Sequence, residues 1–193
     1  MRANPLLRLL QSVQGQTLYP DEILIVDGST NDETEIILTQ NYFDNLHYFR
    51  VSSEHRGLTK QRNYGIARVG TTMEIICFLD DDTVLERDYF EQLLSIYKLH
   101  SNALGVGGYI QNETKWEYIG LNYLPKMNEF YFDRWKRTDG SRFVLRKKLR
   151  LDSDCPPGFS PLFSHGRSVG FLPPSGKVYQ VEQLMGGVSS FRK

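Results

Sequence analysis

The strongest constraint on the fold is an alternation of short, uninterrupted apolar runs with helical segments through the first 110 residues. The runs at 23–26 and 73–79 have the length and composition of strands that are buried on both faces. Apolar residues spaced three and four positions apart predict helices over 4–14 and 87–99. A capping-box sequence at 30–33 predicts the start of a further helix that runs to about residue 39, and another helix is expected over 57–69. Two further strands are expected over 47–51 and 104–110. This alternation predicts an α/β fold built on a parallel sheet.

The composition narrows the class of function. The 193 residues suffice for one domain, and the formal net charge is zero, so the electrostatic footprint of a nucleic-acid binder is absent. No apolar stretch approaches the roughly 18–20 residues that span a bilayer, and no signal peptide is evident. We therefore expect a cytoplasmic enzyme, with docking at the cytoplasmic face of a membrane left open. Cys77 and Cys155 are expected to be reduced thiols without a disulfide or a zinc site.

Three adjacent carboxylates, Asp80, Asp81 and Asp82, follow the second apolar run directly. Because like charges repel, such a triplet at a strand end favours a bound cation. Mg2+ and Mn2+ prefer oxygen ligands, commonly one or two carboxylates together with phosphate oxygens. Alternate residues of an extended chain point the same way, so Asp80 and Asp82 could face one ligand. A solvated loop with an acidic helix cap explains the triplet equally well by itself.

Three other segments place suitable groups where a parallel sheet binds ligands. Asp27 ends the first apolar run, and ligands bind at the carboxyl ends of parallel strands. The side chains of Lys60 and Arg62 suit phosphate oxygens. Gly186 and Gly187 would let the backbone approach a ligand closely. An ordinary turn or a solvated helix face would account for each segment taken alone.

Taken together and in this order, four segments resemble the family 2 glycosyltransferases: EILIVDGSTNDET (22–34), GLTKQRNYGIA (57–67), CFLDDDTVLERDYFEQLL (77–94) and GGVSSFRK (186–193). The resemblance implies the GT-A fold, a Rossmann-like three-layer α/β/α sandwich with a mostly parallel central sheet. It also implies a single domain over residues 1–193, in which 4–110 form the nucleotide-sugar-binding half. Residues 111–193 would be an irregular and incomplete acceptor-side segment, either a long connection or a small antiparallel lobe.

The resemblance implies a role for each matching acidic and basic residue in binding the donor. Asp27 would contact a uracil-type base, and Arg62, together with Lys60, would lie near the base or the diphosphate. Asp80 would approach the ribose, with Asp81 beside it as a further donor-binding residue. A divalent ion, Mg2+ or Mn2+, would be held by Asp82 with help from Asp80 and would bridge to the diphosphate.

The implied activity is the metal-assisted, inverting transfer of a sugar from a nucleotide sugar, a UDP-sugar first among the candidates. The acceptor would be a saccharide or a lipid-linked molecule in cell-surface polysaccharide synthesis, and Gly186 and Gly187 would lie near the sugar and this acceptor. The metal would neutralise charge on the departing nucleoside diphosphate, while an acidic general base deprotonates the acceptor hydroxyl.

The sequence departs from the family pattern at both ends. The family opens with a strand that helps hold the base, whereas this chain starts at the following helix, so we expect the first strand to be missing. The family's general base follows the GG…FR segment, so we expect it beyond Lys193; Glu182, Asp152 and Asp154 are weaker candidates. An open sheet edge would also permit a homodimer.

Two other functions remain open from sequence. Haloacid-dehalogenase-like phosphatases place a similar acidic motif after a buried strand, with Asp80 as nucleophile and Asp82 as acid/base. That assignment leaves Asp27 and Arg62 unexplained. A non-catalytic fragment that binds a nucleotide sugar is the second alternative.

Overall fold

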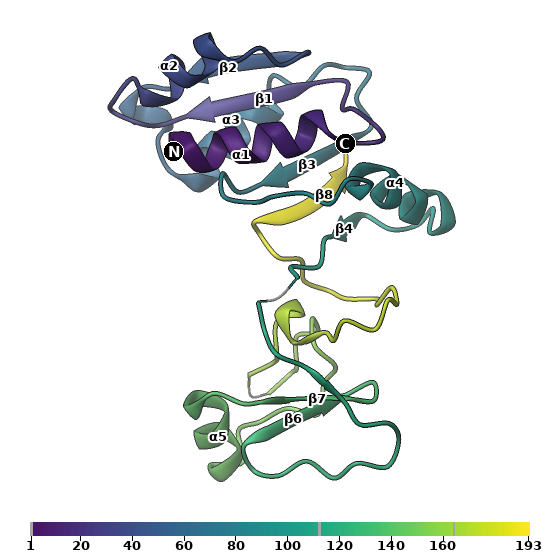
Figure 1. The fold of residues 1–193 in the computed structure, drawn as a ribbon. Helices are drawn as coiled ribbons and strands as arrows, with labels where there is room; N and C mark the ends of the chain where they lie inside the picture. Colours follow the sequence, from purple (N-terminus) through teal and green to yellow (C-terminus); the bar gives the residue numbers. More distant parts are fainter. Residues whose placement is uncertain (1, 112, 164) are drawn as a thin grey trace. The chain divides into compact units, whose positions relative to one another are not determined.

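The computed structural model describes residues 2–111, 113–163 and 165–193. The chain forms two compact units (Figure 1). Unit 1 comprises Met1–Val106 together with Gly186–Lys193, and unit 2 comprises Gly107–Met185. The assignment of residues 1–193 to a single domain stays a prediction.

Unit 1 contains the helices and strands that the sequence predicts for its first 110 residues, in the predicted order. They are α1 (Ala3–Gln14), β1 (Ile23–Asp27), α2 (Glu33–Gln40), β2 (Leu46–Arg50), α3 (Leu58–Ile66), β3 (Ile75–Leu79), α4 (Tyr89–Leu99) and β4 (Gly105–Gly107), with a short 3-10 turn (Ser53–His55) before α3. One further strand, β8 (Val188–Arg192), comes from the end of the chain. The α/β fold class is therefore confirmed.

The prediction of a mostly parallel central sheet is not confirmed. Strands β1 and β2 form a two-stranded parallel sheet. A separate sheet has the order β3-β8-β4, and β3 runs antiparallel to β8. The reason is that the last strand of the chain pairs with one edge of β3, while no described strand joins the other edge of β3 to β1.

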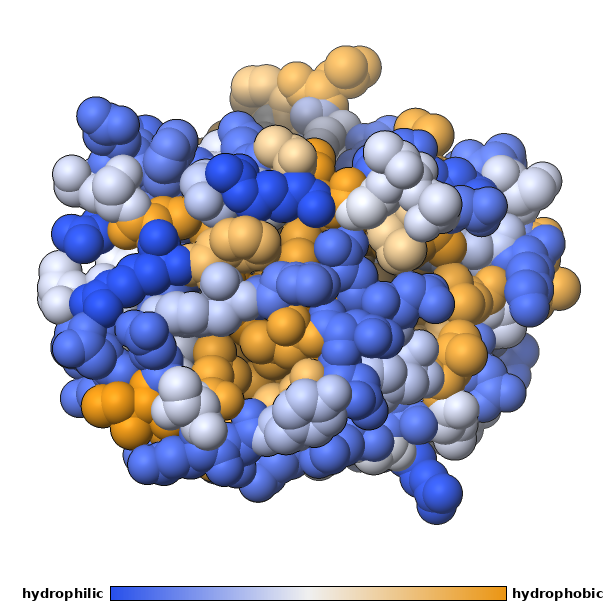
Figure 2. All heavy atoms as spheres, turned by 90° about the horizontal axis from the view of Figure 1, so that it is seen from above, coloured by the Kyte–Doolittle hydropathy of each residue, from blue (hydrophilic) through white to orange (hydrophobic). Residues whose placement is uncertain are grey.

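The core of unit 1 lies between α1 and the parallel sheet. The helix buries one face, as its three- and four-residue spacing of apolar side chains predicts. This face packs with Ile25 of β1 and with two side chains from loops, Phe43 and Leu85; its own buried members are Leu6, Leu9, Leu10 and Val13. Seen from above, the molecular surface shows apolar residues between hydrophilic ones (Figure 2).

The capping box expected at 30–33 does not form. Helix α2 begins at Glu33, and its N-cap residue, Asp32, makes no side-chain capping hydrogen bond. The Asp32 carboxylate instead forms an ion pair with Arg50 at the end of β2. A charged partner from the neighbouring strand therefore outcompetes the backbone amides of the helix for this carboxylate.

Unit 2 is built on a small antiparallel sheet. Strands β5 (Glu117–Tyr118), β6 (Glu129–Phe132) and β7 (Trp135–Thr138) pair in the order β5-β7-β6, and helix α5 (Ser141–Lys148) and a 3-10 turn (Val169–Phe171) follow. The β6–β7 turn places Asp133 and Arg134 at positive φ. Lys177 and Tyr179 both hydrogen-bond the Asp133 carboxylate and so fix this turn. No helix in the described part of either unit is long and apolar enough to cross a membrane.

A buried ion network organises unit 2 around Arg167, whose side chain is 2% exposed. Its two terminal nitrogens donate to the fully buried carboxylate of Asp139 at 2.8 and 3.1 Å. The same guanidinium contacts Asp152 at 2.9 Å, while Lys147 of α5 contacts Asp139 at 2.7 Å. In such a network the attraction between the charges offsets the free-energy cost of removing them from water only while every partner is present.

Replacing Arg167 by Met should destabilise unit 2 by about 3–5 kcal/mol, because it leaves the Asp139 carboxylate buried with a single cationic partner. Urea unfolding followed by tryptophan fluorescence measures this directly, since both tryptophans, Trp116 and Trp135, belong to unit 2. The matched control is Lys177→Met, which removes a cation that is 56% exposed and should cost less than about 1 kcal/mol. An equal decrease in the free energy of unfolding for the two variants would contradict the stabilising role of Arg167.

Candidate functional site

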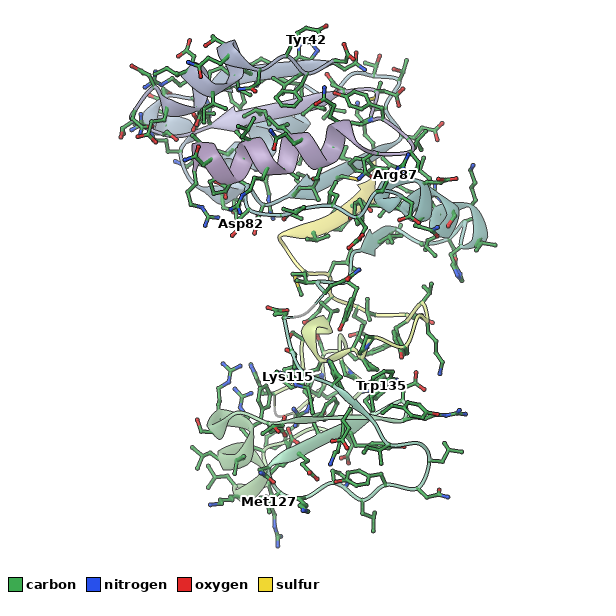
Figure 3. All side chains as sticks on the ribbon, in the orientation of Figure 1. Tyr42, Asp82, Arg87, Lys115, Met127 and Trp135 are labelled. Atoms are coloured by element: carbon green, nitrogen blue, oxygen red, sulfur yellow. The ribbon has the colours of Figure 1, made fainter. Side chains whose placement is uncertain are left out.

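The acidic triplet lies at the carboxyl end of β3. The Asp80 amide donates to the Gly187 carbonyl at 2.9 Å, which continues the β3–β8 pairing by one residue. The side chains of Asp80 and Asp82 are each 52% exposed, whereas that of Asp81 is 19% exposed. Asp82 lies at the surface of unit 1, near the tip of the β3 arrow (Figure 3). The triplet is therefore open to solvent and carries concentrated negative charge.

A guanidinium group already neutralises part of this charge. Arg2 Nη2 lies 2.6 Å from Asp81 Oδ1 and 2.8 Å from Asp82 Oδ2. The Arg2 amide also donates to Asp81 Oδ2 at 2.7 Å, at the N-cap position of α1. The hydrogen bond from Arg2 lowers the pKa of the Asp82 carboxyl. In this structure the cation beside Asp81 and Asp82 is an arginine side chain, and the metal ion expected at the triplet stays a prediction.

Arg62 joins the triplet to the glycine pair. Its Nη2 donates to the Gly186 carbonyl at 2.6 Å and lies 3.6 Å from Asp80 Oδ1. The guanidinium also packs over the ring of Phe78, with its central carbon 5.2 Å from the ring centroid. Residues from α3, from β3 and from the segment before β8 therefore converge at one place, although they are far apart in the sequence.

Gly187 is in close contact with Asp80. A Cβ atom added at Gly187 would lie only 2.9 Å from the Asp80 Cγ, too close for any real pair of such atoms. A Cβ added at Gly186 would meet Arg62 Nη1 at 3.7 Å, an ordinary contact. The absent side chain at Gly187 therefore sets the position of the Asp80 carboxylate.

Asp27 occupies a different environment from the triplet. It is fully buried, and it accepts hydrogen bonds from the Ser29 amide at 2.8 Å, the Ser29 hydroxyl at 2.5 Å and the Tyr48 hydroxyl at 3.1 Å. Burial is the largest influence and opposes ionisation, but hydrogen bonds from Ser29, Thr34 and Tyr48 outweigh it and lower the pKa of Asp27. In this structure Asp27 holds the turn after β1, and its contact with a base stays a prediction.

Lys60 does not lie with Arg62. Residues two positions apart on a helix face different directions. Lys60 accordingly lines a shallow hollow of about 410 Å3 with Glu54 and Tyr64, whereas Arg62 lines the large cavity between β1 and β3. The donor-binding role of Lys60 stays a prediction, and its position in this structure gives it no contact with the triplet.

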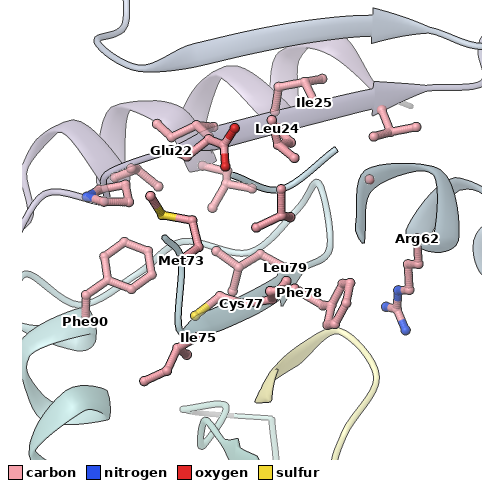
Figure 4. A pocket seen from close by; sticks show the side chains of 18 of the residues that line it. Glu22, Leu24, Ile25, Arg62, Met73, Ile75, Cys77, Phe78, Leu79 and Phe90 are labelled. Carbon is pink, nitrogen blue, oxygen red and sulfur yellow. The ribbon is translucent and has the colours of Figure 1, made fainter. Parts of the chain in front are cut away.

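The converging residues form the polar end of a cavity of about 1100 Å3 in unit 1. Arg2, Arg62 and the three aspartates are among its lining residues, and most of the remaining lining is apolar. Figure 4 shows Arg62 close to Phe78 and the apolar side chains of β1 and β3. Within the described residues, no three His, Cys, Asp or Glu side chains form a group that could hold a metal ion.

Sequence reasoning missed three residues that organise this region. Arg2 binds the triplet, Tyr48 binds Asp27, and Gln61 donates to the Val26 carbonyl at 2.8 Å. Gln61 also accepts from the Gly57 amide at 3.2 Å and so ties β1 to the start of α3. A sequence signal exists only for Gln61, which lies inside the motif that supplies Arg62.

Known proteins with similar sequences include three bacterial glycosyltransferases. They are glycosyltransferase GlyA of Streptococcus pneumoniae (29% identical over 68% of this chain), the putative glycosyltransferase EpsH of Bacillus subtilis (37% over 44%) and the O-antigen chain rhamnosyltransferase RfbN of Salmonella typhimurium (27% over 40%). The aligned segments span 18%, 24% and 24% of those proteins, respectively.

The match to a family model is more extensive than any of these alignments. It covers residues 1–161, a range that includes Arg2, Asp27, Arg62 and the acidic triplet. This range is well over half of the chain. The chain therefore belongs to glycosyl transferase family 2.

Proposed function

We propose that unit 1 binds a nucleotide-sugar donor, with a UDP-sugar as the first candidate, for transfer of its sugar to an acceptor. The observation that carries this proposal is the convergence of Arg62, Asp80 and the Gly186–Gly187 pair beside Asp82, in a chain of this family. The Arg62 guanidinium suits the phosphate oxygens of a nucleoside diphosphate. The two glycines, which have no side chains, leave room for the attached sugar next to the backbone.

We propose that the triplet binds a hard divalent cation, Mg2+ or Mn2+, together with oxygens of the donor diphosphate. Its carboxylates supply the oxygen ligands that these ions prefer, and Asp82 keeps half of its side-chain surface exposed. Asp82, assisted by Asp80, would hold the ion, and the donor diphosphate would supply further ligands. When bound, the ion would neutralise charge on the departing nucleoside diphosphate. The Arg2 guanidinium lies 2.8 Å from the Asp82 carboxylate. When the ion binds, Arg2 would have to move away or contact this carboxylate together with the ion.

The remaining residues position the donor. Arg62 is held over Phe78 and against the Gly186 carbonyl, so its charge is fixed beside Asp80. We propose that it binds the diphosphate, while Asp81 anchors Arg2 and with it the start of α1. Asp27 would shape the base-binding turn through Ser29, with base contact as its further role.

We propose an inverting transfer in which an acidic residue removes the proton from the acceptor hydroxyl. Two of the weaker candidates have other partners: Asp152 pairs with Arg167, and Glu182 accepts from the Ser160 amide at 3.0 Å. The acceptor would be a saccharide or a lipid-linked molecule in cell-surface polysaccharide synthesis. The name of RfbN, an O-antigen chain rhamnosyltransferase, supports that choice of pathway. A cytoplasmic location, contact with the membrane face and a homodimer also belong to this proposal.

The phosphatase alternative is not favoured. The matching family and the three similar proteins are all glycosyltransferases. In addition, Asp80 forms an ion pair with Arg62 and lies in close contact with Gly187. A role of Asp80 as nucleophile does not explain either contact.

Replacing Asp82 by Asn should weaken the Mn2+-dependent binding of the donor by at least about tenfold, since loss of a ligand carboxylate removes both charge and coordination. The measurement is calorimetric titration of UDP-glucose, GDP-mannose and a dTDP-sugar, each with and without MnCl2. Glu33→Gln is the matched control, because it removes an exposed carboxylate on α2 and should leave binding unchanged. If Asp82→Asn binds the best donor as tightly as the parent chain in Mn2+, the metal assignment is wrong.

Gly187→Ala should reduce donor binding by roughly tenfold, because the added methyl displaces the Asp80 carboxylate. Gly15→Ala is the matched control, since Gly15 lies at the far end of α1 from Arg2 and its added methyl meets only ordinary contacts. The same titrations compare the two variants, and circular dichroism checks that both are folded. Equal affinities for the two folded variants would show that the position of Asp80 has no part in binding.

A further inference from the structure

Unit 2 carries an excess of positive charge that the zero net charge of the whole chain conceals. It contains twelve Lys and Arg residues and eight Asp and Glu residues. Five of these cations lie in the basic segment 142–150, RFVLRKKLR, which has no acidic residue. The segment comprises most of α5 and the two residues that follow it. A surface with one sign of charge points to a partner with the opposite sign.

The two acidic residues that flank the basic segment are paired inside unit 2. Asp139 precedes the helix and Asp152 follows the segment, and both pair with the buried guanidinium of Arg167. Their charges are therefore unavailable to the cations at the surface. Three exposed cations of the segment have no carboxylate partner among the described residues, and they are Arg142, Lys148 and Arg150.

Helix stability does not account for these charges. Cations in the last turn of a helix interact favourably with its dipole, which suits Lys148. Arg142 lies in the first turn, where the dipole disfavours a cation, and that turn contains no acidic residue. The position of Arg142 therefore favours a role in binding over a role in folding.

Exposed apolar side chains lie between these cations. Leu145 and Leu149 are 56% and 58% exposed. Leu145 is three or four positions away from Arg142, Lys148 and Leu149, so all four residues share one face of the helix and its C-terminal cap. The opposite face buries Phe143 in unit 2. The outer face of α5 is thus both basic and apolar.

A second exposed apolar segment lies beside α5, namely the loop 121–127 between β5 and β6. The loop contains one lysine and no acidic residue. It exposes three large apolar side chains, those of Leu121, Leu124 and Met127. The Lys147 side chain of α5 donates to the carbonyl of Glu129, two residues after the loop. In Figure 3, Met127 accordingly lies at the end of unit 2 where α5 is found.

The packing of α5 limits the shape of the partner. The Phe143 ring lies 4.7 Å from the Phe171 ring, between centroids, and 4.5 Å from the Arg167 guanidinium carbon. The inner face therefore stays attached to unit 2, and a groove that encloses a whole helix does not fit. A flat surface does. An anionic bilayer offers negative headgroups to the cations and an acyl layer to the leucines, as for helices that lie in a membrane interface.

We propose that unit 2 binds the surface of an anionic phospholipid bilayer through the outer face of α5 and the loop 121–127. Arg142 and Lys148 contact the headgroups, while Leu124 and Leu145 enter the boundary of the acyl layer. The inference rests on the proposed function for its setting, since it gives the membrane contact named there a surface and a lipid charge. The binding itself requires neither donor nor metal.

The first test measures co-sedimentation of the complete chain with two kinds of vesicle. One is phosphatidylcholine alone, and the other contains equal parts of phosphatidylcholine and phosphatidylserine. The chain should bind the mixed vesicles at least about tenfold more tightly, because each cation near an anionic surface adds to the attraction. High salt should reduce this difference. Equal binding to both vesicles, or binding to neither, would overturn the proposal.

Replacing Arg142 and Lys148 together by Gln should weaken binding to the mixed vesicles by at least about tenfold. The matched control, Arg134→Gln with Lys177→Gln, removes the same charge at the β6–β7 turn, at the other end of β6 from α5, and should change binding by less than about threefold. Circular dichroism checks that both variants are folded. Equal losses would show that the total charge drives binding, and not this surface, and would overturn the proposal.

Replacing Leu124 and Leu145 together by Ser should also weaken binding to the mixed vesicles by at least about tenfold, although every cation remains. The matched control is Leu99→Ser with Leu104→Ser, two leucines of unit 1 that are 76% and 82% exposed, and it should bind like the parent chain. If the two variants bind equally, and the parent chain binds polyglutamate as tightly as vesicles, the partner is an acidic protein and the proposal fails.

These vesicle measurements contain neither nucleotide sugar nor Mn2+, so they are independent of the donor titrations. A chain that binds the mixed vesicles but no donor would contradict the proposed function and support the membrane surface. A chain that binds a donor but no vesicles would overturn the membrane surface and leave the donor site supported.

Discussion

The antiparallel pairing of β3 with β8 is the interaction on which the candidate site depends. It places the carbonyl of Gly187 against the Asp80 amide and the Gly186 carbonyl within reach of Arg62. Shifting this register by one residue so that Val188 takes the place of Gly187 would bring a side chain against Asp80 and move the Gly186 carbonyl away from Arg62. The position of the acidic triplet is therefore set by a strand from the far end of the chain, and not by β3 alone.

Two arginines from other parts of unit 1 balance the charge of the triplet. Arg2 holds Asp81 and Asp82 and fixes the start of α1, while Arg62 faces Asp80. These exposed ion pairs contribute little stability by themselves. Half of the Asp80 and Asp82 side-chain surface remains open to solvent, so the proposed cation and diphosphate could replace these ion pairs.

The elements of unit 1 up to β4 could be predicted from the sequence, because uninterrupted apolar runs and helical spacing are local signals. The sheet arrangement could not, since β8 contains Ser189 and Ser190 in place of an apolar run. Ser190 is fully buried, but its hydroxyl is hydrogen-bonded to the Tyr97 hydroxyl and to the Val106 carbonyl. Helix α5 could not be predicted either, because it is rich in basic residues and buries one side chain, Phe143, instead of an apolar face.

The central claim, that the triplet, Arg62 and the glycine pair form one donor site, is tested most directly by paramagnetic broadening in NMR spectra. Mn2+ added with a UDP-sugar should broaden the amide signals of Asp80, Asp82 and Gly187 together. The signals around Lys60 should broaden less, because Lys60 lies on another face of α3. Broadening centred on the hollow beside Glu54, or none at the triplet under saturating donor, would contradict the account.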